Sequence, residues 1–136
     1  IPVLRMSEED EQNPALFQTT LQRKLQLFMN EGHVEQVAIV VSGKYHTSFL
    51  KVQELAEMII HGAEAVISGP YPLIIVLEND IAKVLGNAIN VLLERKKDFI
   101  CIDGIYANDG DYIDIGEPVA MGRVVPVVTK TLIFNS

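Results

Sequence analysis

The sequence has no tryptophan, a single cysteine and fewer basic than acidic residues. One cysteine, Cys101, excludes an internal disulfide and is typical of a reducing compartment. With 11 Lys and Arg against 18 Asp and Glu, the formal net charge is −7, so the basic face that a nucleic-acid-binding module needs is missing. No apolar run is long enough to span a bilayer, and no signal-peptide pattern is visible. These absences predict a protein that binds neither nucleic acid nor membrane.

What is present is enough for one core. The chain has 136 residues, 49% of them hydrophobic, and we expect a single domain over residues 1–136. Because the sequence opens with Ile1-Pro2 and no initiator Met, we interpret it as a fragment of a longer protein. The acidic, polar stretch 7–13 is expected to be a linker-like loop.

Residues 72–97 give the clearest pattern in the chain. Leu73–Leu77 is apolar throughout, as in a strand covered on both faces. Asn79 suits the N-cap of the helix that follows, and Asp80 places negative charge at its positive end. An apolar stripe then recurs at helical spacing, formed by Ile81, Val84, Leu85, Ala88, Ile89 and Leu92.

The same alternation of strand and helix occurs on either side of this unit. Asn13-Pro14 starts a helix, 37–41 reads as a strand, and Thr47 or Ser48 can cap the next helix. The apolar stripe predicted for that helix is Phe49, Val52, Leu55, Ala56, Ile59, Ile60 and Ala63. Beyond a third strand at 99–102 the chain becomes rich in β-branched residues, with a tight turn at 108–110 and Pro126 indicating an edge or a bulge. We therefore predict an α/β fold, a mostly parallel sheet flanked by helices with a β-rich, antiparallel C-terminal part.

In such a sheet the loops after parallel strands gather at one edge, where ligands bind. Three loops qualify: 42–48, 78–80 and 103–108. The candidate ligand- or partner-binding residues in and beside them are Ser42, Gly43, Lys44, Asn79, Asp80, Lys83 and Asp103. For each of them an ordinary loop, cap or surface role is the favoured alternative.

No catalytic or metal motif emerges from the residues. Ser42-Gly43-Lys44 lies between a strand and a helix, but it lacks the first glycine of a phosphate loop, and Tyr45 stands where Ser or Thr is required. Asp103, Asp109, Asp111 and Asp114 do not have EF-hand spacing and are better explained as turn residues. The three histidines are scattered, without a zinc pattern. Cys101 lies in an apolar run and is predicted to be a buried structural thiol.

Three longer strings carry a family resemblance. They are LENDIAKVLGNAI (77–89), FICIDGIYANDGDYIDIGEPV (99–119) and RVVPVVTKTLIF (123–134), in that order. Together they resemble the C-terminal region of the ethanolamine ammonia-lyase reactivating factors, and the opening IPVL and the VSGK loop are similar as well. The resemblance implies a C-terminal piece of an actin-like or Hsp70-like ATPase. It also implies a chaperone-like role, the ATP-dependent release of damaged adenosylcobalamin from inactivated ethanolamine ammonia-lyase.

The resemblance implies partners as well: the lyase itself and the rest of the parent's ATPase core. It places the protein in the cytoplasm and leaves open an association with a bacterial microcompartment. ATP and Mg²⁺ are implied for the parent, and no cofactor for this fragment. The family's Thr-rich Asp-x-Gly phosphate motifs are not found here, since the DIG at 114–116 is followed by Glu117-Pro118.

Two alternatives stay open, a small-molecule-binding α/β module and a purely structural domain. A binding module predicts a pocket at Ser42, Asn79, Asp80 and Asp103, whereas a partner-contacting domain predicts an exposed apolar patch.

Overall fold

The computed structural model describes residues 1–31, 36–46, 48–64, 66–67, 73–93, 99–103, 108–114, 124–128 and 132–135. The elements in chain order are β1 (Val3–Arg5), α1 (Glu8–Gln12), α2 (Pro14–Glu31), β2 (Ala38–Val41), α3 (Phe49–Glu64), β3 (Leu73–Leu77), α4 (Ala82–Leu93), β4 (Phe99–Asp103), β5 (Asp111–Asp114), β6 (Val124–Val128) and β7 (Leu132–Asn135).

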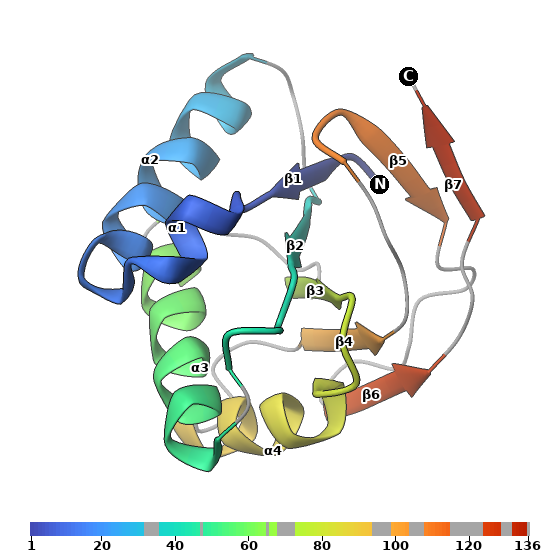
Figure 1. The fold of residues 1–136 in the computed structure, drawn as a ribbon. Helices are drawn as coiled ribbons and strands as arrows, with labels where there is room; N and C mark the ends of the chain where they lie inside the picture. The colour runs from blue at the N-terminus through green and yellow to red at the C-terminus, as the bar shows by residue number, and fades with distance from the viewer. Residues whose placement is uncertain are drawn as a thin grey trace.

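Five of these strands form one sheet in the order β1-β2-β3-β4-β6, and every neighbouring pair is parallel. Strand β3 is central, and all five of its residues are buried. The helices lie along one side of this sheet, and the antiparallel pair β5–β7 lies on the other (Figure 1). The predicted α/β fold with a mostly parallel sheet is therefore confirmed.

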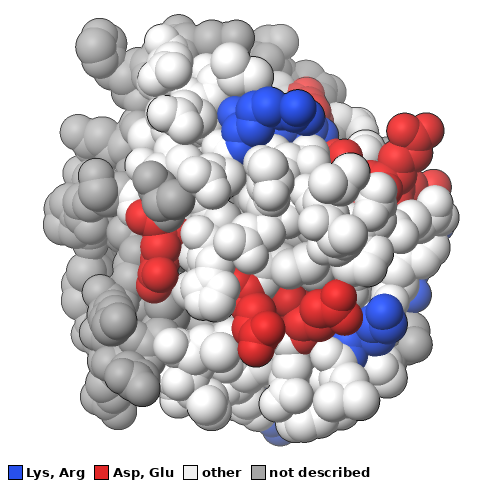
Figure 2. All heavy atoms as spheres, turned by 90° about the vertical axis from the view of Figure 1, so that its left-hand side faces the viewer, with Lys and Arg blue, Asp and Glu red and all other residues white. Residues whose placement is uncertain are grey.

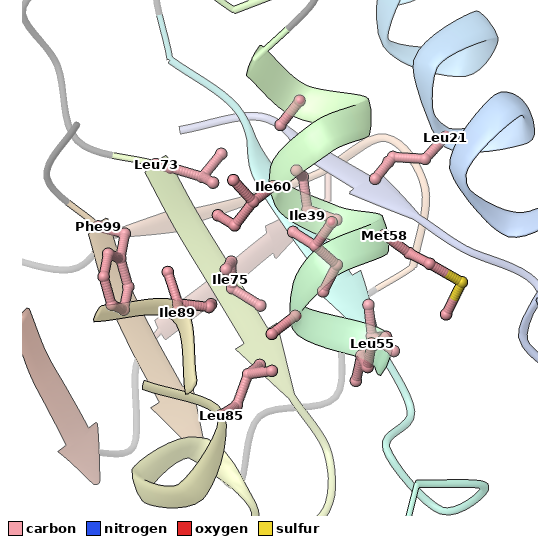
Figure 3. Packing of buried hydrophobic residues seen from close by; sticks show 14 of the residues in the cluster. Leu21, Ile39, Leu55, Met58, Ile60, Leu73, Ile75, Leu85, Ile89 and Phe99 are labelled. Carbon is pink, nitrogen blue, oxygen red and sulfur yellow. The ribbon is translucent and has the colours of Figure 1, made fainter. Parts of the chain in front are cut away.

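Strands β2 and β3 are apolar at every position because both faces of the sheet are buried there. On one face, Ile39, Ile75 and Cys101 belong to the large cluster that the helices complete. On the other face, Val40 and Ile74 belong to a second, smaller cluster. Figure 3 shows the larger cluster, in which side chains of α3 and α4 meet those of the strands. Cys101 is a buried free thiol, as predicted.

Helices α2 and α3 approach closely at Gly62. A Cβ added there would lie 3.1 Å from the carbonyl oxygen of Gln18 and 3.2 Å from Cδ2 of Leu21. A glycine costs helix stability relative to alanine, and here it removes the atom that would separate the two helices. The close packing of α2 against α3 therefore explains the presence of a glycine within α3.

Residues 7–12 were expected to form a loop, and that expectation is wrong. Ser7 caps helix α1 through its side chain, which accepts from Asp10 N–H at 3.1 Å, and the Asp10 carboxylate accepts from Ser7 N–H. This reciprocal capping box satisfies two N–H groups that a short helix would leave unpaired. Composition pointed to a loop because the helix is too short to show an apolar stripe.

The apolar stripe of α3 is confirmed except at its first residue. Val52, Leu55, Ala56, Ile59, Ile60 and Ala63 are buried. Phe49 is 66% exposed, contrary to prediction. Its spacing of four and eight residues places it in line with Gln53 and Glu57, on the solvent side of the helix. Ser48 caps the helix, since its Oγ accepts from Lys51 N–H at 3.2 Å; Thr47 lies outside the described residues.

The C-terminal part was expected to add antiparallel strands, and this expectation is confirmed only in part. Strands β5 and β7 pair antiparallel, whereas β6 extends the main sheet parallel to β4. Strand β6 is the last strand of the sheet, which confirms the edge position that Pro126 indicated. The predicted turn at 108–110 is present, with Asp111 N–H donating to Asn108 C=O at 3.1 Å and Gly110 at φ 86°.

Candidate functional site

Two of the three predicted loops meet at the carboxyl edge of the sheet. Ser42 C=O accepts from the side-chain amide of Asn79 at 2.6 Å and from its backbone N–H at 3.2 Å. Gly43 adopts φ 82°, and a Cβ on it would lie 3.2 Å from Ile81 Cδ1. The loop after β2 and the loop after β3 are therefore joined directly. Asp103 ends β4 in register with Leu77, and residues 104–107 lie outside the described residues.

Asn79 does not cap helix α4, as the sequence analysis expected. The helix begins at Ala82, and Ile81 N–H donates to Asn79 C=O at 2.8 Å in a tight turn before it. The side-chain amide of Asn79 is used across the two loops instead, because Ser42 C=O lies within its reach. Asp80 and Lys83, the neighbouring candidates, are exposed.

The residue that organises this corner is Glu11, which the sequence analysis missed. Its side chain is only 3% exposed. One carboxylate oxygen accepts from Ser42 N–H at 3.1 Å and the other from Gly43 N–H at 3.2 Å. The two loop N–H groups that point toward an anion are thus occupied by a carboxylate of the chain itself. In a run of acidic residues, the sequence does not indicate which side chain is buried. Glu11 therefore could not be distinguished from its exposed neighbours.

The electrostatics of Glu11 follow from its position. Burial raises the pKa of its carboxyl above the ordinary value, and the Glu78 carboxylate acts in the same direction. The two N–H donors and the Arg5 guanidinium lower that pKa. Arg5 is itself ion-paired with Glu78. Glu11 and the two N–H groups from which it accepts form a clamp between α1 and the loop after β2.

Lys44 also faces α1. Its ammonium forms an ion pair with Glu8 and lies 5.1 Å from the centre of the Tyr45 ring. The hydrogen bond with Glu8 raises the pKa of Lys44, and the hydrogen bond from Lys44 lowers that of Glu8. Lys44 N–H donates to Ser42 Oγ at 3.4 Å. The backbone and side-chain groups of the Ser42-Gly43-Lys44 loop are therefore engaged largely within the chain.

Next to this loop lies a cavity of about 180 Å³. It is lined by Glu11, Gln12, Pro14, Tyr45, His46, Lys51 and Glu54. His46 is 4% exposed, and within the described residues neither of its ring nitrogens makes a hydrogen bond. Burial lowers the pKa of His46, while the Glu54 carboxylate opposes that shift. Burial of the ring therefore favours the neutral over the charged form of His46.

A second cavity, of about 300 Å³, lies between α3 and α4 and is largely apolar. We call it the α3–α4 groove; it is lined by Phe49, Gln53, Glu57, Val84, Asn87, Ala88, Val91 and Leu92. Phe49 is 66% exposed, Val84 42% and Val91 77%. Val84 was predicted to lie in the apolar stripe of α4. It lies at the edge of that stripe and is partly exposed. The neighbouring Leu50 is 74% exposed, so the apolar surface extends beyond the groove.

Comparison with known proteins identifies the family. The family described as "Ethanolamine utilisation protein EutA" matches residues 1–135, nearly the whole chain. The chain belongs to the EutA family. Two curated relatives are each named "Ethanolamine ammonia-lyase reactivase EutA": one from Salmonella typhimurium, 43% identical, and one from Escherichia coli, 42% identical. Both alignments cover 67 residues, which is 49% of this chain and 14% of the relative.

This EutA-family chain thus matches only a small part of the length of its curated relatives. No solved structure matches it, so its fold rests on the architecture described above. Family membership confirms the resemblance inferred from the strings at 77–89, 99–119 and 123–134.

Two further observations concern the described residues. Among the described residues, His, Cys, Asp and Glu side chains do not gather in threes that could hold a metal ion. Within the same part of the chain, the helices are too short or too polar to cross a membrane.

Proposed function

We propose that this chain is a partner-contacting domain of a reactivating factor for ethanolamine ammonia-lyase. The observation that carries the proposal is its similarity to two lyase reactivases within a family match over nearly the whole chain. In this role the domain belongs to a chaperone-like, cytoplasmic protein that releases damaged adenosylcobalamin at the expense of ATP. Its partners are the lyase and the remaining part of an actin-like ATPase, and association with a bacterial microcompartment is compatible with this role.

The geometry supports partner contact over small-molecule binding. At the corner of Ser42, Gly43 and Asn79, the backbone groups that could bind a ligand already have partners within the chain. None of the cavities described above is lined by Ser42, Asn79 or Asp80. Large apolar side chains are instead exposed on α3 and α4, and an exposed apolar patch is what a partner-contacting domain predicts.

The contacts of the loop after β2 argue against ATP binding there. A phosphate group needs the N–H groups of Ser42 and Gly43, and the Glu11 carboxylate accepts from both. An anion placed beside Glu11 would also meet its negative charge. We therefore assign the ATP and Mg²⁺ of the proposed mechanism to other residues of the longer protein.

The proposal is tested by a pull-down and a reactivation assay. The 136-residue chain and a longer family protein that contains it are each immobilised and offered purified ethanolamine ammonia-lyase, with and without Mg-ATP. The longer protein is then mixed with inactivated lyase and intact adenosylcobalamin. We expect lyase capture and recovery of deaminating activity. A longer protein that neither binds nor reactivates the lyase would overturn the proposal.

The candidate residues at the corner are tested by a matched pair of variants. We expect Asn79→Ala to cost about 1 kcal/mol, because one hydrogen bond to Ser42 C=O is lost, and to lower the melting temperature by about 4 °C. Asp80→Asn changes an exposed side chain and should leave melting unchanged. If reactivation falls in a stable Asp80→Asn protein, Asp80 contacts a partner; unimpaired reactivation removes it from the site.

A further inference from the structure

The α3–α4 groove has a regular layout. On α3 it is lined by Phe49, Gln53 and Glu57, at successive intervals of four residues. On α4 the corresponding line is Val84, Ala88 and Leu92, again four residues apart. Eight residues of helix extend about 12 Å, so each wall presents two helical turns. A trough of this length between two helices accommodates two to three turns of a partner helix.

The groove carries apolar surface that the fold itself does not cover. Phe49 and Val91 are 66% and 77% exposed, although both lie on helices whose other faces form the core. Figure 2 shows the helical face of the molecule: uncharged atoms predominate, and the charged side chains stand in small, separate groups. An apolar surface in such a setting is characteristic of a protein interaction site.

The charges of the lining indicate what kind of partner fits. Among the described residues that line the groove, Glu57 is the charged one, and neither Lys nor Arg is present. A second copy of this chain brings a formal charge of −7 and its own Glu57 to the contact, which is unfavourable. A partner helix with Lys or Arg beside two aliphatic residues satisfies Glu57 and covers Phe49 and Val91.

We propose that the α3–α4 groove is the surface on which ethanolamine ammonia-lyase docks, through an amphipathic helix that places a basic residue against Glu57. This inference rests on the proposed function and gives it a location. Two aliphatic side chains of that helix, four residues apart, lie between Phe49 and Val84 at one end and Val91 at the other. The basic residue lies at the polar margin formed by Gln53 and Glu57.

Binding of the longer protein to purified ethanolamine ammonia-lyase is measured by surface plasmon resonance at several salt concentrations. Two groove variants, Val91→Asp and Glu57→Lys, are each matched with a control of the same chemistry. Leu16→Asp alters an apolar residue on α2 that is 56% exposed and outside the groove lining. Glu64→Lys alters an exposed acid at the end of α3 that is also outside it.

We expect Val91→Asp to weaken the Kd about tenfold or more, as for a buried interface residue. Glu57→Lys should weaken it about fivefold and reduce its dependence on salt, because an ion pair is replaced by a repulsion. Both controls should bind within twofold of the unaltered protein. Melting curves of all four variants establish that the fold is retained.

Each other outcome overturns the inference in its own way. If the unaltered protein does not bind the lyase, the proposed function fails together with the groove. If it binds and both groove variants bind as the controls do, the groove is not the docking surface, while the proposed function stands. If Val91→Asp halves the mass in solution, a second copy occupies the groove. If Val91→Asp lowers the melting temperature without weakening lyase binding, the rest of the protein covers the groove.

Discussion

At the scale of single residues, one carboxylate determines how the carboxyl edge of the sheet is built. Glu11 belongs to a five-residue helix, yet its carboxylate accepts hydrogen bonds from two N–H groups of the loop after β2. These groups belong to Ser42 and Gly43, 31 and 32 residues away in sequence. The loop after β3 is joined to the same peptide through Asn79. The carboxylate of Glu11 and the side-chain amide of Asn79 satisfy the polar groups of the loop after β2. Burial of these groups therefore costs little free energy.

Removing the Glu11 carboxylate should loosen this corner. In Glu11→Ala the buried N–H groups of Ser42 and Gly43 lose their acceptor, and we expect a loss of about 2 kcal/mol in the free energy of unfolding. Part of the cost is offset, because a buried charge is removed as well. Urea denaturation followed by circular dichroism measures the change. Glu9→Ala, an exposed acid on the same helix, should stay within about 0.5 kcal/mol; equal effects of the two variants would contradict the clamp.

His46 predicts a pH dependence of stability. Burial lowers its pKa below the ordinary 6.5, so the folded state favours the neutral ring more than the unfolded state does. The stability from this preference is full above pH 6.5 and is lost as the pH falls through the folded-state pKa, by at most about 1.4 kcal/mol per pH unit. Between pH 7.5 and 5.5 the unaltered protein should lose more stability than His46→Leu.

The control for this prediction is His61→Leu. His61 is exposed in the last turn of α3, so this variant tests whether replacing any histidine gives the same result. Glu11, whose pKa burial raises, contributes in the opposite direction: its stability is full below pH 4.5 and is lost as the pH rises. That contribution is common to all three proteins and cancels when their profiles are subtracted. Parallel profiles for the unaltered protein and His46→Leu would refute the assignment.

At the scale of elements, the strands and the longer helices were predictable because a single pattern decides each of them. Leu73–Leu77 is apolar at every position, and only a strand covered on both faces places five such residues in a core. Helix α1 was not predicted because it has no apolar stripe, although Ser7 and Asp10 have the spacing of a capping box. The direction of β6 was equally hidden, since parallel and antiparallel strands share a period of two.

The candidate site divides in the same way. Proximity of the loops after β2 and β3 followed from the alternation of strands and helices, which places both at one edge. What the loop groups bind to could not be read from the sequence, because Glu11 reaches them through a tertiary contact with no local signature. Phe49 lies just outside the buried face of α3, and the spacing of apolar residues in the sequence is too coarse to show on which side of that boundary it falls.

The contact between α2 and α3 predicts the effect of filling Gly62. Alanine there gains about 1 kcal/mol of helix propensity. Its Cβ would meet Gln18 C=O at 3.1 Å and Leu21 Cδ2 at 3.2 Å, and overpacking costs about 1–3 kcal/mol. Because the carbonyl belongs to a helix and cannot easily move, we expect Gly62→Ala to destabilise by about 1 kcal/mol net. Thermal unfolding measures this, with Asn90→Ala on the exposed face of α4 as a control. A stabilised Gly62→Ala protein would show that the helices can separate at little cost.

At the scale of the whole molecule, the arrangement separates two surfaces. The carboxyl edge of the sheet, where an α/β domain ordinarily binds its ligand, is closed by contacts with α1. The exposed apolar residues that line a groove lie on the outer side of α3 and α4. Under the proposed function, a domain built in this way acts through contact with other proteins, and its charge of −7 favours partners that carry basic residues.

This arrangement predicts that the 136-residue chain does not bind ATP tightly on its own. The N–H groups of Ser42 and Gly43 are already bonded to the Glu11 carboxylate, and Lys44 is paired with Glu8. An incoming phosphate would have to displace one buried anion and separate one ion pair. Titration calorimetry with Mg-ATP should therefore show no binding in the micromolar range, and phosphate release should not exceed the buffer blank. Glu11→Ala, which frees both N–H groups, provides the decisive comparison. Should the unaltered chain bind Mg-ATP with micromolar affinity and lose that affinity in Lys44→Ala, the loop after β2 would be a nucleotide site rather than a clamp.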